Sequence, residues 1–232
     1  MTDFKVQLYH YPGVRSARVK WLLHEFFNDD FDVIPVDLYA AEQYCQLFSN
    51  INPNHAVPVV NIMTSGNDSY FLAESGAIIT FLVDAFQHKK MAPPPGLSRA
   101  RADFLYIVFL ACSSFDMALW QIRIHSHVLK EQERDLKVVS RYKEKITSEI
   151  APQLLKRISD GGYICGEYSA ADCIIGHCII WAQAYNLCKD DEFMQYISRL
   201  AEREAFRKAF EDAYLFQHEV PGDSPALEHF IG

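Results

Sequence analysis

Two short motifs that flank one predicted β-hairpin constrain this chain most. The first is Val57-Pro58 and the second is Glu74-Ser75. The apolar run at residues 57–62 predicts a strand, and proline belongs at the start of a strand because it cannot donate to the sheet ladder. A bond before proline is also the usual place for a cis peptide bond. We therefore expect a cis Val57-Pro58 bond that turns the backbone N–H and C=O of Val57 outward.

The Glu74-Ser75 pair lies between a predicted strand at 70–72 and a predicted helix at 77–86. This position predicts Ser75 as the helix N-cap, and the free N–H groups of a helix start bind carboxylates. Glu74 beside it could hold an ammonium group, while the free backbone of Val57 could pair with a peptide-like ligand as an added strand does. A carboxylate and an ammonium on one carbon, joined to a peptide backbone, describe the γ-glutamyl and cysteinyl parts of glutathione.

With these motifs the chain resembles the cytosolic glutathione transferases, in particular the bacterial, theta-like or delta-like members. The resemblance implies that Val57, the residue before Pro58, pairs with the cysteinyl backbone of glutathione. It implies that Glu74 and Ser75 hold the γ-glutamyl group and that His55 binds the glycyl carboxylate. Glutathione would be a cosubstrate, and the resemblance covers nearly the whole chain.

The hydrophobic pattern predicts two kinds of structure along the chain. Up to residue 86 it predicts the order β-α-β-α-β-β-α, with strands at 6–9, 31–36, 57–62 and 70–72 and helices at 16–27, 41–48 and 77–86. No strand signal follows the proline-containing stretch 87–98, and long helices are predicted at 99–129 and 133–158. We therefore expect an α/β thioredoxin-like N-terminal domain at 1–86, a linker at 87–98 and an all-α helical domain at 99–232. The hairpin turn is expected around residues 66–68.

Ser169 and Asp172 have the spacing of a capping box, in which each side chain bonds the backbone N–H of the other's position. The apolar run that follows predicts a buried helix. We therefore interpret this pair as a folding element and exclude it from the catalytic candidates.

A glutathione enzyme needs a group that keeps the thiol ionised. A free thiol has a pKa of about 8.5, and lowering it by two units requires about 2.7 kcal/mol of preference for the thiolate. The resemblance directs attention to the segment after Gly13, because serine-type members have the activating hydroxyl directly after this glycine and cysteine-type members have their cysteine one position later. Here those positions are Val14 and Arg15. This departure puts ordinary conjugating activity in question.

Three side chains and the backbone remain as candidates for activating the thiol. Ser16 lies where the first helix should begin, so its hydroxyl could reach the sulfur or could simply cap the helix. Arg15 could supply a positive charge or be solvated, and Tyr11 could offer its phenol. The backbone N–H groups of residues 14–16 are a fourth possibility.

Composition narrows the class of protein. The 232-residue chain has a net charge of −8, which disfavours nucleic acid and anionic membranes as partners. Arg101, Asp103, Asp116 and Arg123 are expected to interrupt the longest apolar stretch before it could span a membrane. The six cysteines include no C-x-x-C pair, so free thiols in a reducing cytoplasm are expected. No metal site is predicted.

The leading hypothesis is a cytoplasmic detoxification enzyme that transfers glutathione to a small hydrophobic electrophile bound between the domains. A glutathione-dependent reductase or thiol-exchange enzyme is the alternative within enzymes, and a non-catalytic glutathione-binding protein is the alternative outside them. The family is mostly dimeric, so a homodimer is expected.

Overall fold

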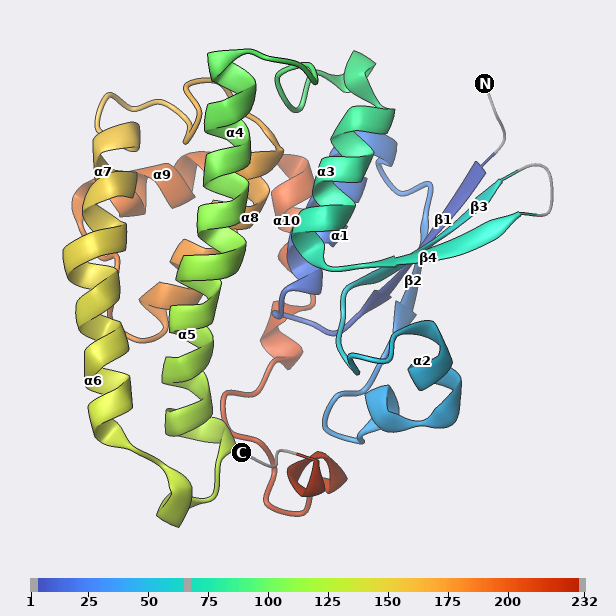
Figure 1. Cartoon of the computed structure of the whole chain (residues 1–232), viewed down its shortest axis with the longest axis vertical. Helices are drawn as coiled ribbons and strands as arrows, with labels where there is room; N and C mark the ends of the chain where they lie inside the picture. The colour runs from blue at the N-terminus through green and yellow to red at the C-terminus, as the bar shows by residue number, and fades with distance from the viewer. Residues whose placement is uncertain (1–3, 65–67, 230–232) are drawn as a thin grey trace. The chain divides into compact units, whose positions relative to one another are not determined.

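In the computed structural model, which describes residues 4–64 and 68–229, the chain forms two compact units (Figure 1). One unit combines Met1–Phe81 with Ala205–Ile231, and the other is Leu82–Glu204. Compactness thus groups the C-terminal segment with the N-terminal part of the chain. The domain boundaries expected at residues 86 and 99 stay a prediction.

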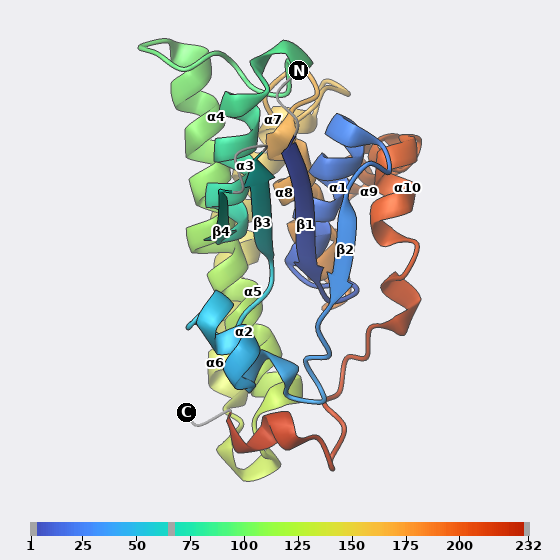
Figure 2. The same ribbon diagram turned by 90° about the vertical axis from the view of Figure 1, so that its right-hand side faces the viewer.

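The first unit contains a four-stranded sheet in the order β2-β1-β3-β4 (Figure 2). The strands are β1 (Phe4–His10), β2 (Asp32–Pro35), β3 (Val59–Thr64) and β4 (Ser69–Ala73). β1 pairs with β2 in parallel, whereas β1 with β3 and β3 with β4 are antiparallel. This mixed sheet confirms the thioredoxin-like fold class. The predicted turn residues 66 and 67 lie outside the described residues.

Three helices follow the strands much as the sequence predicts. α1 (Ser16–Phe27) has the predicted bounds, and α3 (Ser75–Ala85) begins two residues earlier than predicted. The helix predicted at 41–48 is wrong in detail: a 3₁₀ turn at Glu42–Tyr44 precedes α2 (Gln46–Ile51). Ala41 with a φ of 61° and the extended Cys45 break the regular helix at these points.

The C-terminal part of the first unit packs on α1. Trp21 is fully buried, and its ring meets Phe206 edge-on at 4.9 Å between centroids. Phe206 belongs to α10 (Glu204–Phe210), after which a 3₁₀ turn at Ala213–Leu215 and one at Pro225–Glu228 follow. The contact of these aromatic rings anchors α10 to α1.

The second unit is helical, as expected. A continuous helical stretch joins α4 (Arg99–Phe109) and α5 (Asp116–Arg123) through a π-helical segment at Leu110–Phe115 and extends through another at Ile124–Val128. α6 (Leu136–Lys145) and α7 (Ala151–Ile158) continue one another beside it (Figure 1). α8 (Ala170–Gln183) and α9 (Asp191–Ala201) complete the unit. The helix predicted from residue 133 begins instead at Leu136, because the side chain of Asp135 caps it by accepting from the N–H of Lys137.

The stretch Arg99–Val128 is long and apolar enough, by length and composition, to cross a membrane. The four charged residues therefore interrupt the apolar character less than the sequence analysis expected. Buried core helices satisfy the same criteria, and here Phe104, Phe115 and Leu119 are fully buried inside the second unit. One side of this stretch thus packs in the core of that unit.

The capping box at the start of α8 is confirmed. The backbone N–H of Ser169 donates to Asp172 Oδ2 at 2.8 Å, and the reciprocal bond from the backbone to the Ser169 side chain is also present. Asp172 Oδ1 accepts from the backbone N–H of Ile164 at 2.9 Å and from the Tyr196 hydroxyl at 2.6 Å.

Candidate glutathione-binding site

The register of the sheet gathers the predicted binding residues at one edge. Tyr9 of β1 pairs with Val59 of β3, and Val59 pairs with Ala73 of β4. The chain leaves this row directly into the two predicted motifs, because Pro58 precedes Val59 and Glu74 follows Ala73. Residues that are far apart in the sequence thus meet at the end of the sheet where β1 and β4 finish and β3 begins.

The Val57-Pro58 peptide bond is cis, which confirms that expectation. Val57 is buried in a small apolar cluster with Val36, Phe48 and Val59. Tyr11 and Val14, from the loop between β1 and α1, pack against the same cluster. The candidate backbone-binding residue and the candidate thiol-activating loop are therefore neighbours.

The start of α3 presents the Glu74-Ser75 motif. Ser75 is the first residue of the helix, and the Ile78 N–H donates to the Glu74 carbonyl at 2.9 Å. Glu74 therefore occupies the cap position that the sequence analysis gave to Ser75. The free N–H groups of the first turn then begin at Ser75 itself. Glu74 is exposed and has a φ of 70°, a left-handed conformation that a non-glycine residue adopts at a cost of about 1–3 kcal/mol.

A buried arginine lies beneath this helix start. Arg18 of α1 is fully buried, and its Nη1 donates a long hydrogen bond of 3.4 Å to Ser75 Oγ. A guanidinium here adds positive charge at the end of α3 where the helix dipole is already positive. The combination favours a carboxylate at Ser75.

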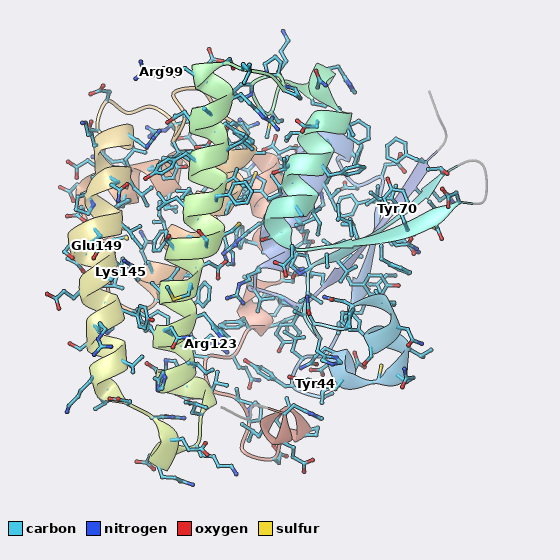
Figure 3. All side chains as sticks on the ribbon, in the orientation of Figure 1. Tyr44, Tyr70, Arg99, Arg123, Lys145 and Glu149 are labelled. Atoms are coloured by element: carbon cyan, nitrogen blue, oxygen red, sulfur yellow. The ribbon has the colours of Figure 1, made fainter. Side chains whose placement is uncertain are left out.

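His55 lies on the other side of the cis-proline motif and is half-buried. Its Nδ1 lies 2.9 Å from the carbonyl oxygen of Gln43, so Nδ1 carries the proton and Nε2 is left for a ligand. The ring packs at 4.8 Å from that of Tyr44, whose other neighbour is His229 in a stack at 3.9 Å. Tyr44 lies just before α2 (Figure 3), and burial raises the pKa of its hydroxyl.

Ser16, the first residue of α1, is fully buried. Its Oγ accepts from the Tyr11 N–H at 3.2 Å and lies 3.0 Å from the Tyr11 carbonyl oxygen. It also lies 2.8 Å from Nδ1 of His10. The hydroxyl of Ser16, which follows the β1–α1 loop (residues 11–15), therefore holds the first residue of the loop and the last residue of β1.

The hydrogen-bond chain continues from His10 into the C-terminal segment. His10 is buried, and its Nε2 lies 3.1 Å from Asp212 Oδ2. The same oxygen accepts from Lys20 Nζ at 2.8 Å. Burial alone would raise the pKa of Asp212, but the hydrogen bonds from His10 and Lys20 and the positive charge of Lys20 outweigh it and lower the pKa to about 2.

Arg15 occupies the N-cap position of α1 and is partly exposed. The first turn of α1 has no acidic residue, so the positive end of the helix dipole and the arginine act in the same direction. An anion beside this loop would be stabilised by both.

Sequence reasoning missed four residues of this region: His10, Arg18, Lys20 and Asp212. His10, at the end of the first strand and six residues before Ser16, had a local signal. Arg18 and Lys20 are buried in a helix that is mostly apolar and buried, which is an unusual position for charges. Asp212 had no local sequence signal, because 202 residues separate it from His10.

Residues 4–84 match the family model for the N-terminal domain of glutathione S-transferases. No curated protein matches the chain in sequence.

Solved structures resemble the chain over most of its length. A glutathione transferase family member from Pseudomonas fluorescens, with two glutathione bound, is 20% identical with a TM-score of 0.76, covering 89% of this chain and 92% of that one. The transferase URE2P6 from Phanerochaete chrysosporium, in complex with oxidized glutathione, is 21% identical with a TM-score of 0.76, covering 92% and 97%. One from Burkholderia graminis, with two glutathione molecules per subunit, is 19% identical with a TM-score of 0.76, covering 89% and 88%.

These likenesses show a shared fold, while the family model identifies the N-terminal domain that carries the candidate site. Residues 4–84 of this chain therefore form a glutathione S-transferase N-terminal domain, and the chain as a whole has the fold of the solved glutathione transferases.

Proposed function

We propose that this protein binds glutathione at the edge where β1, β3 and β4 end, ionises its thiol and transfers it to a small hydrophobic electrophile. The observation that carries the proposal is the convergence of the Val57-Pro58 and Glu74-Ser75 motifs through one row of paired residues in the sheet. The backbone of Val57 pairs with the cysteinyl part, and the start of α3 holds the γ-glutamyl carboxylate. Glu74 binds the ammonium, and His55 binds the glycyl carboxylate.

In the transfer step the thiolate sulfur attacks an electrophilic carbon and forms a carbon–sulfur bond. The leaving group departs with its electron pair, or, with an activated alkene, the adjacent carbon takes a proton from solvent. The protein's part is to hold the sulfur as a thiolate near neutral pH, for which one charge-assisted hydrogen bond and a helix N-terminus suffice.

The geometry favours Arg15, Tyr11 and the backbone N–H groups of residues 14–16 as the groups that stabilise the thiolate. Arg15 and Tyr11 are partly exposed, whereas Ser16 is fully buried and bonded to His10 and Tyr11. The Ser16 hydroxyl would have to leave these partners to reach a ligand. We therefore propose that Ser16 acts on the thiol through the loop.

The test is a pH titration of the thiolate ultraviolet absorbance of bound glutathione. Losing a charge-assisted hydrogen bond of about 1.5–3 kcal/mol should raise the thiol pKa by about one to two units. We expect this shift for Arg15→Ala and a smaller one for Tyr11→Phe, with Lys5→Ala as the control. If no variant moves the midpoint by about half a unit, the backbone N–H groups become the explanation. A bound thiol that stays protonated in the native protein would make it a non-catalytic glutathione-binding protein.

A second function, glutathione-dependent disulfide reduction, is favoured by the ligands of the structural neighbours. Two of the structures described above hold two glutathione molecules, and a third holds oxidized glutathione. In this reaction the glutathione thiolate attacks one sulfur of a disulfide, forms a mixed disulfide and releases the other sulfur as a thiolate. Parallel assays with a chloronitrobenzene and with a small disulfide would show which reaction is faster.

We further propose that the protein is cytoplasmic and forms a homodimer. Its six cysteines are free in the structure, as in proteins of reducing compartments. Light scattering should give twice 26.6 kDa at micromolar concentration. A mass of one chain would contradict the dimer.

A further inference from the structure

The C-terminal segment contacts the β1–α1 loop at two places. Asp212 bonds His10 directly before the loop, as described above. Phe216 packs on Gly13 inside the loop, so closely that a Cβ at Gly13 would lie 2.9 Å from the Phe216 Cβ. Gly13 also has a φ of 71°, so both the backbone conformation and the ring require glycine here. The loop is therefore held from outside by residues some 200 positions away.

Tyr39 joins this contact. Its ring meets that of Tyr11 edge-on at 5.5 Å, and its hydroxyl donates to the carbonyl of Gln217 at 2.5 Å. The Ser224 hydroxyl in turn donates to the Tyr39 carbonyl at 2.5 Å. The C-terminal segment thus bonds both the side chain and the backbone of Tyr39, whose ring packs against the loop.

The chemistry of His10 determines the direction of the hydrogen bonds. With a pKa of about 2, Asp212 is ionised near neutral pH and can only accept, so Nε2 of a neutral His10 must carry the proton. Nδ1 is then an acceptor, and the Ser16 hydroxyl donates to it over 2.8 Å. The lone pairs of Ser16 remain for the Tyr11 N–H, which donates to Oγ at 3.2 Å.

The opposite tautomer would change the loop. If Nδ1 carried the proton, it would donate to Ser16 Oγ and compete there with the Tyr11 N–H. The Ser16 hydroxyl would turn to the Tyr11 carbonyl, which lies 3.0 Å away. The charged groups that face His10 are Asp212 and, through it, Lys20, with Glu211 3.7 Å from Lys20. All of them act on His10 through the one oxygen, Asp212 Oδ2.

We propose that Asp212, His10 and Ser16 form a positioning relay by which the C-terminal segment fixes the β1–α1 loop in the geometry that stabilises the glutathione thiolate. The inference rests on the proposed function. None of the three residues touches the sulfur: Asp212 sets the His10 tautomer, His10 orients the Ser16 hydroxyl, and Ser16 holds Tyr11.

The test is Asp212→Asn, which keeps the shape of the side chain. The uncharged amide can present either its oxygen or its nitrogen to His10 Nε2, so it removes the carboxylate that holds the proton on Nε2 and lets the tautomer reverse. We expect the thiol pKa of bound glutathione to rise by about one unit, a tenfold loss of thiolate at a fixed pH below the midpoint. At a pH below both thiol midpoints, the calorimetric affinity for glutathione should stay within about twofold, since Glu74 and Ser75 are untouched. The matched control is Glu211→Gln, which removes the neighbouring carboxylate and should leave the thiol pKa unchanged.

A second measurement tests the relay in the protein without glutathione, through the exchange rate of one backbone amide. Hydrogen exchange of the Tyr11 amide, followed by NMR in the ligand-free protein, should be at least about fivefold faster in Asp212→Asn than in the native protein, with the amides of β3 unchanged. If native protein lowers the thiol pKa and Asp212→Asn does so equally, the relay is wrong and the proposed function stands. If native protein binds no glutathione, the proposed function fails, and an unchanged Tyr11 amide would overturn the relay independently.

Discussion

The buried serines at the starts of α8 and α1, Ser169 and Ser16, do different things. At α8, Ser169 and Asp172 cap the helix between themselves, and the remaining carboxylate oxygen is satisfied by Ile164 and Tyr196. At α1, Ser16 makes no such cap. It bonds to Tyr11 in the preceding loop and to His10 at the end of β1, and the bonds continue to Asp212. The second oxygen of Asp212 has no hydrogen-bond partner among the described residues.

The two carboxylates differ in the same way. Burial raises the pKa of Asp172, and the hydrogen bonds that it accepts only partly oppose this effect. The pKa of Asp212 is lowered to about 2, because His10 and Lys20 outweigh its burial. The network at α8 is closed and serves stability. The network at α1 is partly open, connects distant segments and lies beside the candidate site, as expected of a functional region.

The largest effect that separates the two networks should come from Asp172→Ala. This change leaves the buried Ile164 N–H, Ser169 N–H and Tyr196 hydroxyl without their acceptor, at about 1–3 kcal/mol for each group. We expect the free energy of unfolding to fall by several kcal/mol in urea titrations. Glutathione affinity of the remaining folded protein should not change. If Asp172→Ala also weakens glutathione binding, the α8 network contributes to the binding site as well as to stability.

The next largest effect concerns α3, whose start we assign to the ligand. Removing a buried or charge-bearing partner of the γ-glutamyl group should cost more than about 1.4 kcal/mol, a tenfold loss of affinity. We expect this for Ser75→Ala and for Glu74→Ala in calorimetric titrations, with thermal stability nearly unchanged. Glu74→Gly separates the charge from the backbone, because glycine relieves the left-handed strain. If Glu74→Gly binds as well as the native protein, the carboxylate is not a ligand.

A smaller effect should come from Ser16→Ala. It leaves the Tyr11 N–H and His10 Nδ1 without their common partner, and we expect a loss of about 1–3 kcal/mol in unfolding together with a raised thiol pKa. Ser169→Ala is the comparison, because it should lower stability by about 1 kcal/mol and leave the thiol pKa alone. Equal behaviour of the two variants would remove the distinction between the networks.

What the sequence could predict follows from the range of each interaction. The capping box spans four residues, and the α1 bounds follow from a repeat of apolar residues on one helix face, so both were predicted correctly. The cis bond and the fold class were also predicted, because Val57-Pro58 and the order of strands and helices are local signals.

What the sequence could not predict depends on long-range packing or on single backbone conformations. The helix expected at 41–48 is broken by Ala41 in a left-handed conformation, which no local residue preference signals. Asp212 reaches His10 only because the aromatic rings of α10 dock on Trp21. The local pattern around Ser16 suited an N-cap and a thiol donor equally. Only its hydrogen bonds with His10 and Tyr11 indicate the third role, positioning of the β1–α1 loop.

The smallest effect, and the one that tests the α1 network most directly, is a difference in acid stability. The folded pKa of Asp212 is about 2, below the ordinary value of 3.8. The folded state therefore binds fewer protons than the unfolded state between these values, so the stability from Asp212 is fully present above about pH 4 and is lost as the pH falls toward 2. In Asp212→Asn this dependence should disappear. Urea unfolding at pH 5, 3.5 and 2.5 should show the two proteins converging as the solution becomes more acidic, and Glu211→Gln should follow the native protein. A constant difference between native protein and Asp212→Asn at all three pH values would mean that Asp212 stabilises the fold by its shape and not by its charge on His10 and Lys20.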